Sequence, residues 1–205
     1  MSSPAAALRV RRMSAADLDR VVEIAMSLQQ APRWPASAYG TAINPLHTPR
    51  RIALVAESEP EKQTSGAKAP VDVAGLDVRA EALTLHRTSF SAAGDRAPFR
   101  NEGFGPASGR IVGFAVAGVA APEAELETIA VIAEGQRRGV GGQLLKALAE
   151  ELRTEQVTVL MLEVRASNRE ALGFYRAQGF QEIGRRPRYY ADPEEDAVLM
   201  RLNLV

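Results

Sequence analysis

The chain has 205 residues, of which 46% are hydrophobic, so it can form one large domain with a packed core or a domain that carries an insertion. Its 25 Lys and Arg residues balance 25 Asp and Glu residues, which argues against a general binder of nucleic acid or of membrane surfaces. The absence of cysteine excludes disulfides, thiolate metal sites and a cysteine nucleophile. The two histidines, His47 and His86, are too few for a histidine-based metal site, so we expect no metal.

The sequence contains no targeting segment that we recognise. The apolar run from Ala5 to Leu8 is too short for a signal peptide, and no stretch approaches the length of a membrane span. We therefore expect a cytoplasmic protein with no membrane partner and no direct nucleic-acid partner.

The first quarter of the chain alternates between strand and helix patterns. Ser14 and Asp17 have the spacing of a capping box at a helix start. Trp34, the only tryptophan, falls between two expected helices. The pattern predicts, in order, a strand from Leu8 to Met13, a helix from Ala15 to Gln29, a short helix from Pro35 to Ile43 and a strand from Arg51 to Glu57.

Residues 58–108 have a weak pattern, rich in polar residues, glycine and proline. Short strands fit Val71 to Val78 and Ala82 to Leu85. A segment of this length is either functional or disordered, and its composition favours a flexible or partly ordered insertion. We expect it to interrupt one domain that spans residues 1–205.

In the second half of the chain, the pattern first predicts strands from Gly109 to Val119 and from Glu125 to Val131, and a helix from Val140 to Leu152. It then predicts a strand from Val157 to Val164, a helix from Asn168 to Gln178, a strand from Phe180 to Gly184 and a last strand from Ala197 to Asn203. Arg185 to Glu195 is predicted to be a polar loop. This order predicts an α/β fold with a mixed central sheet flanked by helices and a long insertion between its second and third strands.

A glycine-rich turn at the start of a helix is the first candidate ligand site. Arg137 and Arg138 precede Gly139, Gly141 and Gly142. Backbone N–H groups and the positive end of the helix dipole attract anions there, and arginines add charge-assisted hydrogen bonds. The residues fit neither the P-loop nor the dinucleotide fingerprint. They predict a diphosphate or nucleotide site, the alternative being a turn with solvated arginines.

The following strand and helix carry three further candidates. Glu163 has apolar neighbours, so it is either a general base facing a cleft or the partner of a basic residue such as Arg165. Asn168 and Tyr175 are seven residues apart and share one helix face, where an elongated ligand could meet both. Tyr175 could protonate a departing thiolate, or it could pack in the helix interface as Phe174 would.

Several of these motifs resemble the GNAT superfamily of acetyl-CoA-dependent N-acetyltransferases, beginning with Gln136 to Gly141. Within it, the chain resembles the bacterial ribosomal-protein-alanine N-acetyltransferases. That likeness rests on Leu162 to Asn168 with Ala171, Tyr175, Gly179 and Phe180, on Arg185-Arg186 with Tyr189-Tyr190, on Glu195 to Ala197 before Met200, and on Pro32 to Trp34. It covers nearly the whole chain except residues 58–108. The long insertion and Gly173 in the helix are departures.

The resemblance implies a GNAT fold with acetyl-CoA as cosubstrate. It assigns Glu163 as the general base and Tyr175 as the general acid. Asn168 would contact the cofactor. Its pantetheine arm would pair with the backbone of Ile129, Ala130 and Val131, and its pyrophosphate would be held by Arg137, Arg138, Gly139, Val140, Gly141 and Gly142.

The expected acceptor is the free α-amine of an Ala- or Ser-starting protein N-terminus, such as that of a ribosomal protein. An α-amine has an ordinary pKa of about 8, so one weak base suffices and the amine can attack the thioester directly. Trp34 on one side, with Tyr189 and Tyr190 on the other, would wall the peptide. A small-molecule amine acetyltransferase and a non-catalytic acyl-CoA-binding regulatory module are the alternatives.

Overall fold

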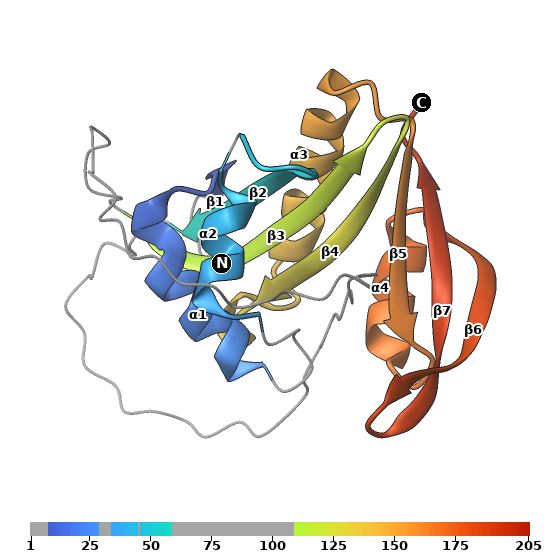
Figure 1. Ribbon diagram of the computed structural model, residues 1–205. Coiled ribbons are helices and arrows are strands. Elements are labelled where there is room, and N and C mark those ends of the chain that lie inside the picture. The colour runs from blue at the N-terminus through green and yellow to red at the C-terminus, as the bar shows by residue number, and fades with distance from the viewer. Residues whose placement is uncertain (1–7, 29–33, 45, 59–108) are drawn as a thin grey trace, which may run out of the picture.

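The computed structural model describes residues 8–28, 34–44, 46–58 and 109–205, and the short strands expected within residues 71–85 lie outside this part of the chain. Seven strands form one mixed sheet in the order β1-β2-β3-β4-β5-β7-β6 (Figure 1). They are β1 (Leu8–Arg12), β2 (Arg50–Ser58), β3 (Arg110–Ala120), β4 (Glu123–Val131), β5 (Val159–Arg165), β6 (Gln181–Ala191) and β7 (Glu194–Asn203).

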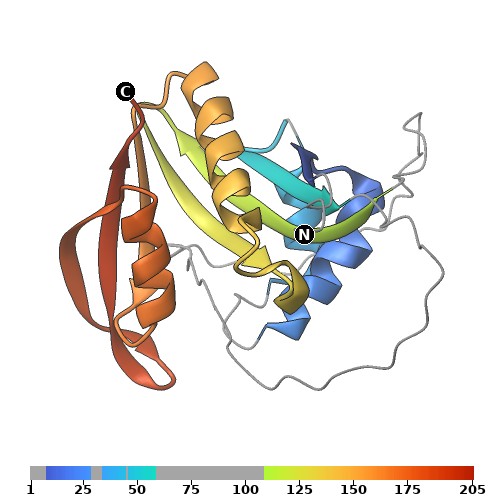
Figure 2. The same ribbon diagram turned by 180° about the vertical axis from the view of Figure 1, so that it is seen from behind.

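Helices cover both faces of the sheet. On one face lie α1 (Leu18–Ser27) and α2 (Ala36–Ala42), and on the other lie α3 (Val140–Thr154) and α4 (Arg169–Ala177) (Figures 1 and 2). Two 3-10 turns, η1 (Ala15–Asp17) and η2 (Ala133–Gly135), precede α1 and α3. The predicted α/β fold, with its mixed sheet and its insertion between the second and third strands, is confirmed. Among the described residues, no helix has both the length and the apolar character needed to cross a membrane.

The start of the first helix shows how local sequence fixes local structure. The expected capping box forms, because the Ser14 backbone N–H donates to Asp17 Oδ2 at 2.7 Å. Asp17 is buried and also accepts two hydrogen bonds from Arg11, which in turn donates to Glu57 of β2. This ion triad joins β1, η1 and β2. The cap therefore ends up tied to the sheet as well as to its own helix.

The prediction of a polar loop from Arg185 to Glu195 was wrong. These residues continue β6 to Ala191 and begin β7 at Glu194, forming an antiparallel hairpin with register shifts between Arg186 and Tyr190. Among the described strands, β6 lies at the edge of the sheet and pairs with β7 alone, and much of it is exposed. An edge strand needs backbone pairing more than apolar alternation, so its sequence does not show the strand pattern.

The centre of the sheet opens between β4 and β5. Their parallel pairing covers only Glu123–Glu125 against Val159–Met161, although both strands continue beyond it. β4 also bulges at Glu127, where its register against β3 shifts between Leu126 and Thr128. The two strands visibly diverge in Figure 1. The divergence leaves the second half of β4 without β5 as a neighbour, beside the start of α3.

A buried ion pair crosses the sheet at the bulge. Arg51 Nε of β2 lies 2.7 Å from Glu127 Oε2 of β4, and the two side chains are 12% and 4% exposed. The intervening β3 residue is Gly118, where a Cβ would sit 3.2 Å from Glu127 Oε1. Glycine therefore leaves the room through which Glu127 reaches Arg51. This pair anchors β4 immediately before the segment that forms the site.

Candidate functional site

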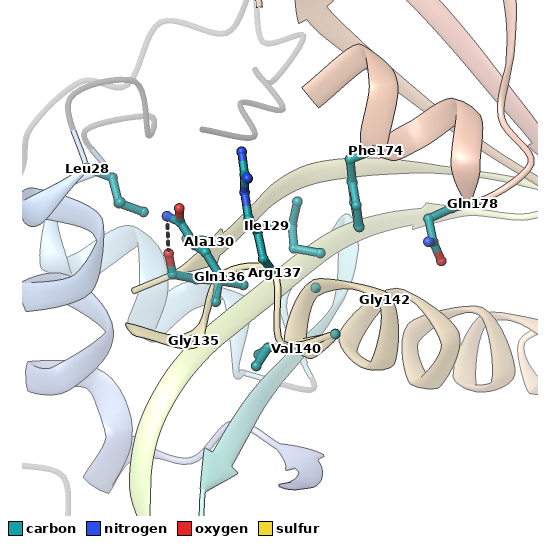
Figure 3. Close-up of a pocket in the computed structure, with 13 residues that line it drawn as sticks. Leu28, Ile129, Ala130, Gly135, Gln136, Arg137, Val140, Gly142, Phe174 and Gln178 are labelled. Carbon is teal, nitrogen blue, oxygen red and sulfur yellow. Dashed lines mark hydrogen bonds between the residues drawn. The ribbon is translucent and has the colours of Figure 1, made fainter. Parts of the chain in front are cut away.

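A cavity of about 280 Å³ lies where β4 ends and α3 begins (Figure 3). Most of its lining residues come from the end of β4, from the glycine-rich turn and from the start of α3, while the residue after α1 and the C-terminal part of α4 with the residue after it contribute the rest. The lining comprises Leu28, Ile129, Ala130, Val131, Gly135, Gln136, Arg137, Gly139, Val140, Gly141, Gly142, Phe174 and Gln178. The structure thus brings together all the expected cofactor residues except Arg138 and Asn168.

The first turn of α3 has the geometry of an anion site. Gly139, its N-cap residue, has φ +82°, a left-handed conformation that glycine adopts without steric cost. The backbone N–H of Gln143 donates to the Gly139 carbonyl at 3.0 Å as an i→i−4 bond. The N–H groups of Val140, Gly141 and Gly142 precede this bond and point out of the helix start. They concentrate partial positive charge at the cavity.

Arg137 adds a full positive charge to this helix start. Its side chain extends over the cavity in Figure 3 and is 62% exposed. Its Nη2 lies 3.9 Å from Glu170 Oε1, an exposed ion pair of the kind that contributes little. The guanidinium can therefore exchange that contact for a bound phosphate. Arg138 is exposed and does not line the cavity, so its cofactor contact stays a prediction.

Helix α4 closes the cavity opposite α3. A Cβ at Gly141 would lie 3.3 Å from Phe174 Cζ, and one at Gly142 would lie 3.5 Å from Gln178 Oε1. The two glycines therefore let α3 and the side chains of α4 approach each other closely. On the β4 side, Gln136 Nε2 donates to the Val131 carbonyl at 3.1 Å, which ties the turn to the end of the strand (Figure 3).

Sequence reasoning missed five lining residues: Leu28, Gly135, Gln136, Phe174 and Gln178. Gln136 stands in the motif that defines the turn, so its role could have been found. Phe174 and Gln178 are four residues apart and therefore share a face of α4. Leu28 follows α1, which covers the other face of the sheet. Only the tertiary structure could place it here.

Glu163 lies outside this cavity, in a smaller pocket of about 60 Å³. Its side chain is 5% exposed, and Arg186 Nε lies 3.0 Å from its Oε1. The expected salt bridge therefore exists, with Arg186 as the partner. Arg165 pairs with Glu195 instead, at 3.4 Å. Burial raises the pKa of Glu163 and outweighs the lowering effects of the nearby Tyr189 hydroxyl and the Arg186 charge. A carboxylate with a raised pKa suits a general base.

Of the three aromatics expected to wall the acceptor, Tyr189 lies beside the candidate base. Burial and the nearby Glu163 carboxylate raise the pKa of Tyr189 to about 12. Tyr190 is only 5% exposed, with the Arg165 guanidinium carbon 4.1 Å from its ring centroid. Trp34 packs against Tyr39, with ring centroids 5.3 Å apart. The wall role of all three stays a prediction.

Tyr175 and Asn168 occupy structural positions in α4. Tyr175 is fully buried, with its ring centroid 5.3 Å from Phe174 and 5.4 Å from Phe180. It does not line the cavity, whereas Phe174 does. Asn168 caps α4, because its Oδ1 accepts from the Ala171 N–H at 3.0 Å. The general-acid role of Tyr175 and the cofactor contact of Asn168 stay predictions.

A mixed sheet that opens at its centre beside a glycine-rich helix start is the arrangement of an acyl-CoA-dependent transferase of the GNAT type. Residues 81–180 of the chain match the acetyltransferase (GNAT) family. The [ribosomal protein bS18]-alanine N-acetyltransferase of Haemophilus ducreyi is 38% identical over 97 residues, which cover 46% of this chain and 67% of that protein. The chain belongs to the GNAT acetyltransferase family.

Other relatives and solved structures agree with this placement. The [ribosomal protein bS18]-alanine N-acetyltransferase of Salmonella typhimurium is 46% identical over 98 residues, 47% of this chain and 66% of that protein. The chain therefore matches just under two thirds of that relative's length. The crystal structure of the ribosomal-protein-S18-alanine N-acetyltransferase from Escherichia coli has a TM-score of 0.62, is 24% identical and covers 97% of this chain and 94% of that one. Arabidopsis thaliana NAA60, in complex with a bisubstrate analogue, has a TM-score of 0.64 at 14% identity, covering 96% of this chain and 99% of that one.

Proposed function

We propose that this protein transfers the acetyl group of acetyl-CoA to the free α-amine of a protein N-terminus that begins with alanine, such as that of a ribosomal protein. The observation that carries the proposal is the cavity where β4 parts from β5 at the start of α3. The names of the relatives support the choice of an alanine N-terminus as acceptor.

The cavity fits the two chemically different parts of acetyl-CoA. The N–H groups at the start of α3 and the Arg137 guanidinium suit the diphosphate. Beyond Glu125, β4 has no pairing with β5, so its backbone from Ile129 to Val131 can pair with the amide groups of the pantetheine arm. These residues would hold acetyl-CoA with its thioester directed toward the opening between the strands.

The proposed chemistry is a direct attack without a covalent enzyme intermediate. Glu163 accepts a proton from the acceptor's ammonium group, and the freed nitrogen lone pair forms a C–N bond to the thioester carbonyl carbon. The nitrogen loses its second proton to solvent as the tetrahedral intermediate collapses to the amide. Backbone N–H groups of Ile129 to Val131 stabilise the oxyanion. As the C–S bond breaks, Tyr175 donates its hydroxyl proton to the departing thiolate. The products are an N-acetylated N-terminus and CoA.

The chemistry of the base favours an α-amine over a lysine side chain. A lysine amine, with an ordinary pKa of about 10.4, costs about 3–4 kcal/mol to deprotonate at pH 7, at about 1.36 kcal/mol per unit. An α-amine costs less than about 1.5 kcal/mol on the same scale. A single buried carboxylate such as Glu163 can therefore deprotonate an α-amine more readily, because the free-energy cost is smaller.

The test is a competition between an Ala-starting peptide and an N-blocked peptide of the same sequence that contains lysine, with products quantified by mass spectrometry. We expect acetylation of the free N-terminus and a loss of peptide acetylation when Tyr189 or Trp34 is changed to alanine. Preferential acetylation of the blocked peptide would contradict the acceptor assignment. CoA binding without transfer to any amine in a panel of peptides and small amines would instead indicate a non-catalytic binding module.

A further inference from the structure

Tyr189 lies in a part of β6 that regular strand pairing does not hold. Arg186 of β6 is paired with Ala197 of β7, and the next pair along the hairpin is Tyr190 with Glu195. Between these two pairs β6 advances by four residues while β7 advances by two, so residues 187–189 form a bulge. The position of Tyr189 therefore depends on contacts other than the β6–β7 ladder.

The side chain of Arg165, the last residue of β5, supplies such contacts. Its Nη1 donates to the Pro193 carbonyl at 3.3 Å and to Glu195 Oε2 at 3.4 Å. Its Nη2 donates to the Asp192 carbonyl at 3.1 Å. The guanidinium carbon also lies 4.1 Å from the Tyr190 ring centroid, which is a cation–π contact. One side chain therefore contacts both strands of the hairpin and the turn between them.

Backbone hydrogen bonds join the same two regions. Glu195 Oε1 accepts from the backbone N–H of Ser167, which follows β5. The Asp196 carbonyl accepts from the Ala166 N–H at 3.0 Å. Within the bulge, the Arg188 N–H donates to Asp196 Oδ1 at 2.9 Å. The end of the hairpin is thus held against the end of β5 at several points around the Arg165 guanidinium.

The ion pair between Arg165 and Glu195 is largely shielded from solvent, since the two side chains are 17% and 16% exposed. Burial acts to raise the pKa of Glu195, but hydrogen bonds from Ser167 and Arg165 outweigh it and lower that pKa overall. The carboxylate therefore stays ionised at neutral pH. The pair of Arg176 with Glu182, which joins α4 to the start of β6, is 55% and 31% exposed and of a kind that contributes little.

We propose that Arg165 is a positioning residue for the acceptor, because it holds the end of the β6–β7 hairpin against β5 and so fixes Tyr189 beside Glu163. Glu163 lies two residues before Arg165 in the same strand. The Tyr189 and Tyr190 ring centroids are 5.2 Å apart in an edge-to-face contact, and Tyr190 is the ring that Arg165 contacts. The inference rests on the proposed function, in which Tyr189 walls the peptide next to the base.

This arrangement predicts a selective loss of peptide affinity when Arg165 is removed. A loosened hairpin lets Tyr189 take several positions, and the peptide must then order it on binding, which raises KM. The chemical step uses Glu163, whose strand keeps its pairing with β7, so kcat should change less. CoA affinity should not change, because Arg165 does not line the cavity at the start of α3.

The first experiment is fluorine NMR of protein that carries fluorotyrosine, with CoA and without peptide. The chain has four tyrosines, so each signal can be assigned by a Tyr→Phe variant. Tyr39 and Tyr175 are fully buried in the core and report on the integrity of the fold. We expect Arg165→Met to shift or broaden the signals of Tyr189 and Tyr190 and to leave the two core signals in place.

Two further variants sharpen this reading. Arg165→Lys keeps a positive charge near Glu195 but lacks the planar fork of donors, so it should change the same two signals less. Arg176→Met is the matched control, because it removes the arginine of an exposed pair at the other end of β6. It should leave the signals of Tyr189 and Tyr190 unchanged.

The second experiment is kinetic, with an Ala-starting peptide. Arg165→Met should raise KM about tenfold and lower the rate at saturating peptide by less than about threefold. In a Tyr189→Ala background, the same substitution should have little further effect on KM, because Arg165 acts through Tyr189.

An unmoved Tyr189 signal in Arg165→Met would overturn the inference, and so would KM effects of Arg165→Met and Tyr189→Ala that simply add. If the core signals show that Arg165→Met does not fold, Arg165→Lys decides by the same criteria. Because the NMR measurement needs no peptide, a protein that acetylates no α-amine would refute the proposed function while the finding that Arg165 fixes Tyr189 would stand.

Discussion

Gly141→Asp tests the anion site at the start of α3 by placing a carboxylate where the diphosphate is proposed to bind. Gly141 is the second residue of α3 and lines the cavity. The new Cβ would lie 3.3 Å from Phe174 Cζ, so the ring has to move by a few tenths of an ångström. The added carboxylate then faces the N–H groups that we assign to the diphosphate.

The expected loss of CoA affinity follows from Coulomb's law. Two unit charges 4 Å apart repel by about 1 kcal/mol in water and by about 4 kcal/mol at an effective dielectric constant of 20. A diphosphate carries two charges, so we expect a loss of at least about 2 kcal/mol, or roughly a 30-fold increase in Kd. An aspartate in the first turn of a helix stabilises that helix by about 0.3–1 kcal/mol. The variant should therefore remain folded while it loses affinity.

Isothermal titration calorimetry with CoA, at low and high salt, measures the effect. The charge part should shrink at high salt because ions screen it. Gly141→Ala separates the methyl group from the charge. The matched control is Gly173→Asp, an exposed glycine of α4 whose added Cβ meets no atom within 4 Å. Wild-type CoA affinity in Gly141→Asp, or an equal loss in Gly173→Asp, would refute the assigned site.

Three further predictions address the chemistry and the stability of the fold. Tyr175→Phe and Glu163→Gln should each slow single-turnover acetyl transfer by roughly 10²–10⁴-fold. Glu163→Gln should also remove the acidic limb of the pH–rate profile. A wild-type rate in either variant would exclude the proposed role of the substituted residue. Arg51→Met should cost about 3–5 kcal/mol of unfolding free energy in urea, because it leaves the Glu127 carboxylate buried without its partner, and adding Glu127→Leu should recover most of the loss. Burial raises the pKa of Asp17, but hydrogen bonds from its arginine and serine neighbours outweigh this and lower it overall. Its stabilisation is therefore fully present above an unfolded pKa of about 4 and is lost as the pH falls below that value, so Asp17→Asn should flatten the acid side of the stability curve.

The hydrophobic pattern of the sequence predicted the elements that pack into the core, but it did not predict the strand at the edge of the sheet. The strand at β5 and the helix at α3 bury apolar side chains, so their periodicity shows in the sequence. The residues from Arg185 to Ala191 form part of β6, where backbone pairing to β7 replaces burial. The sequence pattern also could not identify the ion-pair partner of Glu163, which is Arg186 of β6 and not the sequence neighbour Arg165.

Local sequence patterns were sufficient to predict the order of the elements and an anion site at the start of α3. Both depend on interactions within a few residues: the left-handed Gly139, the helix N–H groups and the adjacent Arg137. Only the folded chain shows how far β4 and β5 separate, that Phe174 lines the cavity while Tyr175 is buried behind it, and that Arg186 faces Glu163. These features depend on strand register and on helix packing across the sheet, which bring together residues that are far apart in the chain.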